Sequence, residues 1–196
     1  MKREELKEQN RRRILQAATE LMIQQGIAHT SIKEVSEKSG ISFVTMYKYF
    51  DSKEALAEEV VYDFQKKHLD QLLEDVTDKD LSFKEMIRVF EKNQQELEEL
   101  LGPEGFEEFR VFGQKSERIA AYFKEMQKQL VTMLIMAGRV SGVIHTKASN
   151  DSILMFVSWL MEYIENRHEE LTEDQMADIE SLFMYGLVGK GEHKNI

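Results

Sequence analysis

One short run of the sequence carries side chains suited to contact the edges of nucleic-acid bases. The amine of Lys48 can donate hydrogen bonds to O6 or N7 of guanine in the major groove. Phe43, Val44 and the methyl group of Thr45 suit the methyl group of thymine. Ser42 adds a hydroxyl directly before them. The chemistry that this run indicates is the recognition of bases or of nearby phosphates.

A second candidate contact lies at Thr30 and Ser31, directly before a predicted helix. Ser31 is followed three residues later by Glu34, which is the spacing of a capping box. At such a helix N-terminus the hydroxyls, the backbone N–H groups and the helix dipole all favour a phosphate. We therefore expect Thr30 and Ser31 to contact the backbone of a nucleic acid.

The elements that must position these side chains are short helices. The apolar spacing predicts a first helix over about 4–25, a second over 31–38, a third over 43–49 and a fourth over 53–74. Two short helices joined by a four-residue turn with Gly40, packed on a longer helix, describe a helix-turn-helix. The third helix is then the recognition helix, whose N-terminal residues enter the major groove. Of the aromatic residues, Phe50 is expected in the core and Tyr47 on the nucleic-acid side, while Tyr49 suits either place.

The motifs of this segment also resemble a known family. They are Arg13-Ile14-Leu15-Gln16-Ala17-Ala18, Gly26, Thr30-Ser31-Ile32, Val35-Ser36, Ser39-Gly40-Ile41-Ser42, Thr45-Met46-Tyr47-Lys48-Tyr49-Phe50 and Ser52-Lys53-Glu54-Ala55-Leu56. Together they resemble the DNA-binding domain of the TetR family of bacterial transcriptional regulators. That resemblance implies that Tyr47 and Lys53 hold phosphates. The family usually places a small or polar residue where Phe43 and Val44 stand, which predicts greater reliance on thymine contacts and on DNA shape.

Composition fits an all-α chain that works in the cytoplasm. Good helix formers dominate, no apolar run is long enough to cross a membrane, and the absence of cysteine fits a reducing compartment. Residues 1–53 carry ten Lys and Arg against seven Asp and Glu, whereas residues 54–196 carry 16 against 29. Only the N-terminal part therefore has the charge expected of a DNA-binding domain. We predict a three-helix DNA-binding domain over 1–53 and a larger helical effector-binding and dimerisation domain over 54–196, with about nine helices in all, two of them separated by a break at Gly102-Pro103.

The last two predicted helices, over about 151–168 and 173–188, carry apolar residues around more than one face. Helices of this kind need to be covered on two sides. The family resemblance implies that they pair with their two-fold mates in a homodimer, and the alternative is that they form the core of a monomer. The predicted interface residues are Ile153, Phe156, Val157, Leu160, Ile164, Ile179, Leu182, Phe183 and Gly186.

The middle helices are rich in Phe and Met. The family resemblance implies that such helices surround a cavity for a small-molecule effector, and methionine adapts well to variable apolar ligands. An ordinary helical core is the alternative for any one of these residues. The predicted effector-binding residues are Phe64, His68, Met86, Phe90, Phe109, Tyr122, Met126 and Met133.

The sequence thus predicts a homodimer that binds a palindromic operator in double-stranded DNA, most simply a repressor that a small, largely apolar effector releases. The helix over 53–74 would act as the lever between the two domains. Two other classes stay open: a DNA-binding protein of the same fold that acts through a protein partner without a ligand, and a helical interaction module that has lost DNA binding. No catalytic residue, metal site or cofactor is predicted, because the five histidines never occur at metal-binding helical spacing.

Overall fold

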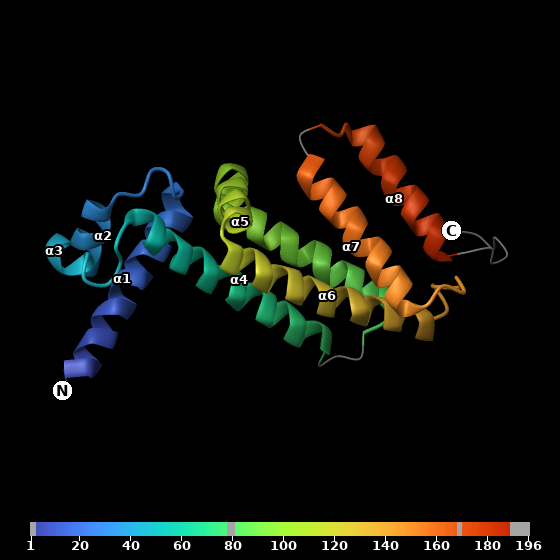
Figure 1. The fold of residues 1–196 in the computed structure, drawn as a ribbon, viewed down its shortest axis with the longest axis horizontal. Coiled ribbons are helices and arrows are strands. Elements are labelled where there is room, and N and C mark those ends of the chain that lie inside the picture. Colours follow the sequence, from blue (N-terminus) through green and yellow to red (C-terminus); the bar gives the residue numbers. More distant parts are fainter. Residues whose placement is uncertain (1–2, 78–80, 168–169, 189–196) are drawn as a thin grey trace. The chain divides into compact units, whose positions relative to one another are not determined.

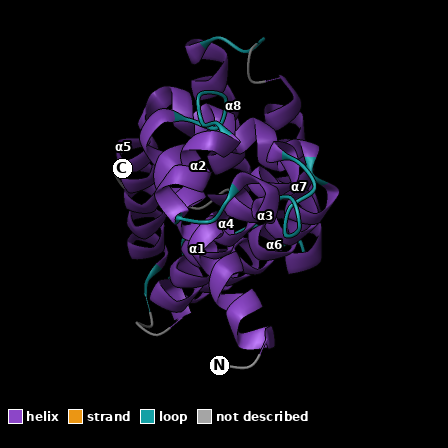
Figure 2. Ribbon diagram, turned by 90° about the vertical axis from the view of Figure 1, so that its left-hand side faces the viewer, coloured by secondary structure: helices purple, strands orange, loops and turns teal. Residues whose placement is uncertain are grey.

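The computed structural model describes residues 3–77, 81–167 and 170–188. Every element in these ranges is a helix, and Figure 2 shows the helices joined by loops, with no strand in the described part of the chain. The prediction of an all-α fold is confirmed. None of the described helices is long and apolar enough to cross a membrane.

The first three helices form the helix-turn-helix at the N-terminal end of the chain (Figure 1): α1 (Arg3–Gln25), α2 (Ile32–Ser39) and α3 (Phe43–Met46). Helix α1 ends at Gly26, whose φ of 84° lies in the left-handed region that favours glycine. The predicted capping box opens α2, since Ser31 accepts from the backbone N–H of Glu34 and the Glu34 carboxylate accepts from Ser31. These local signals set the length and the direction of each helix.

Helix α3 is shorter than its predicted range of 43–49. It covers four residues and continues as a tight turn in which the N–H of Lys48 donates to the carbonyl of Thr45, and that of Tyr49 to Met46. Such i→i+3 bonds are typical where an α-helix ends. The side chains from Phe43 to Lys48 still lie on one continuous helical turn.

Five further helices complete the described chain: α4 (Lys53–Thr77), α5 (Phe83–Lys115), α6 (Glu117–Val140), α7 (Asn150–Arg167) and α8 (Glu173–Val188). The described residues hold eight helices rather than about nine, because the two helices expected on either side of Gly102 run on as α5. The backbone is nevertheless broken there, with Gly102 at φ 67° and ψ 164°, and Pro103 follows. The break was predicted correctly, but it kinks one element instead of separating two.

The chain forms two compact units. The first comprises residues 1–74 and 90–124, and the second comprises residues 75–89 and 125–196. In the first unit, the helix-turn-helix and the following helices share one apolar core that includes Ile14, Val35 and Val60. The second unit has its own core, with Val131 and Ile135 among its members. Compactness thus groups the N-terminal helices with parts of α5 and α6, and the functional boundary after residue 53 stays a prediction.

Candidate functional site

Buried side chains and local hydrogen bonds fix α3 in place. Met46 and Phe50 are buried in the core of the first unit. At the start of the helix, Ser42 Oγ accepts from the N–H of Thr45 at 3.3 Å and lies 2.8 Å from Thr45 Oγ1. Tyr49 is half-buried, and its hydroxyl accepts a hydrogen bond from Asn10 of α1 at 3.3 Å. The prediction that Phe50 belongs to the core is confirmed, and Tyr49 is tied to α1.

The opposite side of α3 is exposed. The exposed fractions are 49% for Phe43, 72% for Val44 and 43% for Tyr47, and Lys48 is exposed as well. The rings of Phe43 and Tyr47 meet edge to face, with their centroids 5.0 Å apart. The predicted base-contacting side chains therefore lie together on one accessible surface, and Tyr47 does not belong to the core.

Ser31 and Lys53 form a second accessible group, at the N-terminus of α2. Lys53 Nζ, at the start of α4, donates to the carbonyl of Ala28 at 3.0 Å. The Glu34 carboxylate accepts from the hydroxyl and the N–H of Ser31, and these bonds hold its pKa below the ordinary value. An incoming phosphate at this helix end would therefore meet Lys53 together with a carboxylate that already occupies the capping position.

Thr30 needs a correction. It was expected to offer its hydroxyl to a phosphate, but its side chain is only 2% exposed. Its Oγ1 donates to the carbonyl of Gly26 at 2.7 Å and so supports the turn that precedes α2. A buried hydroxyl that is already bonded does not reach the DNA backbone. The accessible group at this position is Ser31.

Charged side chains tie α1 to α4 and α6 in the first unit. The Glu59 carboxylate accepts from Arg11 of α1 at 2.9 Å and from Arg118 of α6 at 2.6 Å. The guanidinium of Arg118 also lies 3.8 Å from the centroid of the Tyr62 ring. Burial by itself would raise the pKa of Glu59, but the hydrogen bonds and charges of the two arginines outweigh it and lower that pKa.

A further tie, which the sequence did not predict, lies at the turn between α1 and α2. Glu108 of α5 accepts from the N–H of Ile27 at 2.6 Å and from that of Ala28 at 3.4 Å. A Cβ on Gly26 would lie 2.8 Å from Glu108 Oε2, so glycine leaves room for the carboxylate as well as permitting the turn. Glu108 is one of several glutamates in an acidic helix, and nothing in the sequence indicates that it accepts a hydrogen bond from Ile27, 81 residues away.

The predicted effector-binding residues of the first unit lie in its interior or on its edge. Phe64 and Phe109 are buried with their ring centroids 5.1 Å apart, and His68 lies 4.4 Å from Phe64. Burial lowers the pKa of His68. Phe90 is half-buried, as is Tyr122.

Two polar side chains of α4, Asp70 and Gln65, also belong to the first unit. The hydroxyl of Tyr122 donates to Asp70. Partial burial, and to a lesser extent this hydrogen bond, raise the pKa of Tyr122 to about 12. Gln65, beside Phe64 in the sequence, has a buried Oε1 without a hydrogen-bond partner among the described residues. An unpartnered buried oxygen is unusual, and it offers an acceptor to a ligand or a water molecule.

The remaining predicted effector-binding residues belong to the second unit. Met86 and Met126 are buried there, and Met133 is half-buried with its sulfur 4.0 Å from the hydroxyl of Thr77. The predicted set is therefore divided between the two units. Two surface pockets of the described residues lie elsewhere, one on α7 and one between α1 and α2.

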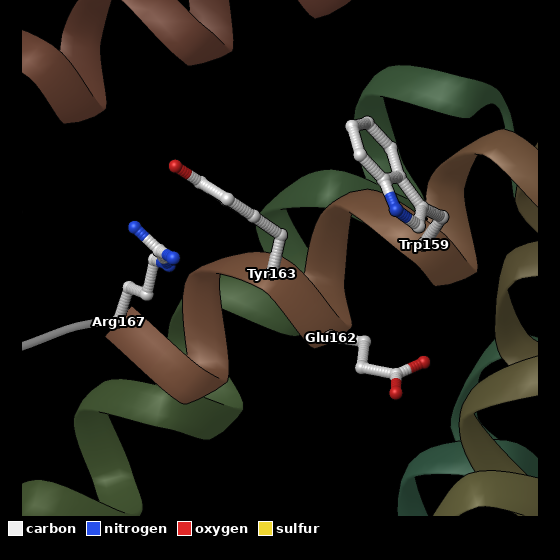
Figure 3. Close-up of a pocket in the computed structure, with 4 residues that line it drawn as sticks. All are labelled: Trp159, Glu162, Tyr163 and Arg167. Carbon is white, nitrogen blue, oxygen red and sulfur yellow. The ribbon is translucent and has the colours of Figure 1, made fainter.

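Helices α7 and α8 pack on each other and leave an aromatic surface open. The rings of Phe156 and Phe183 stack with centroids 6.2 Å apart. Figure 3 shows Trp159, Tyr163 and Arg167 on one side of α7, where together with Glu162 they line a shallow pocket of about 270 Å³. We define this aromatic surface by its exposed residues, which are Met155, Phe156, Trp159, Tyr163, Leu182 and Tyr185.

The predicted interface residues divide between this surface and the core. Phe156 and Leu182 are exposed, and nothing lies within 4 Å of a Cβ placed on Gly186. Ile153 and Val157 are corrected to core positions, because both are buried in the core of the second unit. Leu160, Ile164, Ile179 and Phe183 are half-buried. The predicted set omitted Met155, Trp159, Tyr163 and Tyr185, although large apolar residues at helical spacing on α7 pointed to that face.

Comparisons with known proteins agree with this architecture. The family described as bacterial regulatory proteins, tetR family, matches residues 14–60. The HTH-type transcriptional regulator YvkB of Bacillus subtilis (strain 168) is 28% identical over 158 residues, which cover 80% of this chain and 82% of that protein.

Two solved structures share the fold at low sequence identity. A transcriptional regulator from Saccharomonospora viridis, solved with choline, is 17% identical, with a TM-score of 0.58 over 92% of this chain and 98% of that one. FadR from Bacillus subtilis, solved with stearoyl-CoA, is 16% identical, with a TM-score of 0.52 over 89% and 97%. Residues 14–60 of this chain thus match the tetR family of bacterial regulatory proteins, and the exposed side of α3 and the helical fold agree with that match.

Proposed function

We propose that the chain is a repressor that binds a palindromic operator as a homodimer and is released by a small, largely apolar effector. The observation that carries the operator part is the accessible surface of α3, flanked by Ser31 and Lys53. One short recognition helix reads only a few base pairs, so two copies related by a dyad are needed for a selective site. A palindrome is the operator symmetry that such a dimer requires.

The aromatic surface of α7 and α8 supports the homodimer. Trp159 is 60% exposed and Leu182 72% exposed, so large apolar side chains meet solvent in the single chain. Contiguous apolar patches of this kind are typical of protein–protein interfaces, and aromatic residues are enriched at their centres. A second copy, with the same surface, would cover these side chains across a two-fold axis.

The Phe64–Phe109 cluster supports an effector site in the first unit. Similar folds accept ligands, as the choline and stearoyl-CoA complexes show for those two regulators. In this chain the cluster offers aromatic faces and a half-buried His68, and the same unit holds the unpartnered Oε1 of Gln65. A largely apolar ligand with one hydrogen-bond donor fits that combination.

Two contacts could carry the effector's signal to the DNA-binding helices. Helix α4 starts at Lys53, which is a proposed phosphate contact, and it also contains Phe64 of the aromatic cluster. Glu108 holds the turn before α2, and the next residue, Phe109, packs on Phe64. A ligand that displaced Phe109 would therefore shift Glu108 with it. The ligand can change the operator affinity only by as much as its own affinities for the two arrangements differ.

The alternative is a regulator of the same fold that acts through a protein partner without a ligand. The burial of Phe64, Met86, Phe109 and Met126 favours it, because side chains of an ordinary helical core are buried in the same way without any ligand. Melting temperatures measured with a library of apolar small molecules separate the two proposals. Stabilisation by any compound that also weakens operator binding supports the effector, and the absence of both effects across the library supports the partner.

The experiment that tests the operator proposal selects bound fragments from the regulator's own genome and measures the affinity of the best fragment at several salt concentrations. We expect sequence-selective binding that weakens steeply with salt, because phosphate contacts release counterions. Lys53→Ala should lower the slope of log K against log salt by roughly one for each half-site. Lys92→Ala, an exposed lysine on α5, is the matched control and should leave the slope unchanged. The proposal is wrong if selection returns no preferred sequence.

A further inference from the structure

The recognition surface of α3 is unusually apolar for a surface that meets DNA. Phe43, Val44 and Tyr47 all expose much of their side chains there. The ring of Phe43 is held edge to face by Tyr47, so it presents a fixed apolar group rather than a freely rotating one. The buried residues of the turn, such as Met46, belong to the core of the first unit and not to this surface.

Few groups on this surface can donate or accept hydrogen bonds to bases. The hydroxyls of Ser42 and Thr45 lie 2.8 Å apart and bond to each other, and Ser42 Oγ also caps the N–H of Thr45. Lys48 is the only charged residue between positions 42 and 50. Arginine, lysine, asparagine and glutamine are the side chains that make bidentate contacts with guanine or adenine, and of these the turn contains Lys48 alone.

The major groove presents one apolar group in unmodified DNA, the C5-methyl group of thymine. Against Val44 and Phe43, the hydrogen-bonding groups of a G·C pair would lose their bonds to water without compensation. Against a thymine methyl, both partners bury apolar surface. We propose that Val44 and Phe43 read thymine methyl groups, so that each operator half-site carries thymine at the one or two positions facing them. This inference rests on the proposed operator binding and specifies what that operator contains.

The size of the effect follows from the burial of one methyl group. Removing a buried methyl changes an equilibrium constant about fourfold. Because a palindrome presents the same contact twice, removing the methyl from both half-sites should weaken binding about 15-fold. Phosphate contacts are unaffected, so the salt dependence of the affinity should not change.

The test uses the full chain and the operator recovered by genomic selection. Each thymine in turn is replaced symmetrically by deoxyuridine, which removes only the methyl group, and the affinity is measured by fluorescence anisotropy at one salt concentration. We expect the roughly 15-fold loss at one or two symmetric positions and no change at the others. An operator with 5-methylcytosine opposite guanine at an affected position should be bound more tightly than the same operator with cytosine there.

The Val44→Ala variant tests whether Val44 is the side chain that contacts the thymine methyl group. Val44 is exposed, so the variant should keep the melting temperature of the original chain. It should bind the thymine operator more weakly, yet bind the deoxyuridine operator as well as the original chain does, because the two changes remove the same contact. Lys53→Ala is the contrasting control and should weaken binding to both operators equally.

The outcomes separate this inference from the function on which it rests. If deoxyuridine lowers the affinity at no position, the proposed contact with thymine methyl groups is wrong, while operator binding itself still stands. Equal weakening of both operators by Val44→Ala would overturn the assignment to Val44. If selection returns no preferred sequence at all, the proposed operator binding is wrong, and the proposed contact with thymine methyl groups is wrong with it.

Discussion

Replacing Glu108 by alanine should lower both the stability of the first unit and its affinity for DNA. The carboxylate of Glu108 accepts from the N–H groups of Ile27 and Ala28, directly before the accessible N-terminus of α2. Without it, these two donors lose their protein acceptor, and the turn that sets the start of α2 is held only by its own bonds. The perturbation therefore acts on the position of the DNA-binding helices without touching a DNA-contacting residue.

The magnitude follows from the two distances. The bond to Ile27 at 2.6 Å is a short, charge-assisted bond, whereas the one to Ala28 at 3.4 Å is at the edge of the hydrogen-bond range. Hydrogen bonds to charged groups contribute about 1.5–3 kcal/mol, and water can replace part of the loss at a half-buried turn. We expect about 1.5 kcal/mol, which corresponds to a melting temperature lower by about 3–6 °C in a chain of this length.

The operator affinity should fall as well. If the loosened turn has to be ordered again when α2 and α3 dock on DNA, the same free energy is taken from binding. That amounts to a loss of about tenfold for each DNA-binding domain. Glu108→Gln keeps an oxygen acceptor without the charge and should lose about half of the free energy. Glu104→Ala, at an exposed position on the same helix, is the matched control.

Thermal unfolding followed by circular dichroism measures the first effect, and fluorescence anisotropy with the selected operator measures the second. The reasoning is refuted if Glu108→Ala matches Glu104→Ala in both measurements, because the contact would then contribute nothing. A lower melting temperature with unchanged operator affinity would restrict the role of Glu108 to stability. It would also remove α5 from the proposed route of the effector's signal.

Three further predictions follow from contacts elsewhere in the chain. Leu182→Glu should turn the dimer into a monomer in sedimentation experiments and weaken operator binding about tenfold or more. Val140→Glu, at an even more exposed apolar residue of α6, should change neither, and a dimer that survives Leu182→Glu contradicts the aromatic interface. Glu59→Gln should lower the melting temperature at pH 7. Because the pKa of Glu59 is depressed in the folded state, its contribution is present above its ordinary value of 4.5 and is lost as the pH falls through the lowered one, so the difference between variant and original should shrink in acid; a difference that does not depend on pH argues against the ion pairs. Gly26→Ala should destabilise the chain more than Gly142→Ala. Both glycines have positive φ, which costs about 1–2 kcal/mol for alanine, but only at Gly26 does the new Cβ also meet a carboxylate oxygen, at 2.8 Å; equal melting temperatures would contradict that close contact.

The N-terminal helices could be predicted from the sequence because their signals are local. A capping box at Ser31 and Glu34 depends on residues three apart, and the structure contains it. The buried Phe50 and the exposed Tyr47 follow from their places on one short helical turn. Where the chain also resembles a family, the resemblance and the local chemistry point to the same residues.

What the sequence could not supply depends on contacts between distant segments. Thr30 has the residue type of a phosphate ligand, yet tertiary burial commits its hydroxyl to Gly26. Ile153 and Phe156 are both apolar residues of α7, but Ile153 is buried in a core that also contains residues of α5, α6 and α8, whereas Phe156 is exposed. Glu108 is one of many glutamates in an acidic body, and its partner lies 81 residues away.

The nature of the contacts that hold α1 bears on how an effector could act. The apolar core between α1 and α4 is non-directional and tolerates small shifts, whereas a hydrogen bond weakens steeply as its distance and angle change. Glu108 and Phe109 are consecutive on α5 and so move together as one helix. A ligand that displaces Phe109 by a fraction of an ångström would then break the bond to Ile27 while the core persists. The DNA-binding helices would lose their alignment without unfolding. On this argument, Glu108→Ala should still bind the effector but show little further loss of operator affinity when it does.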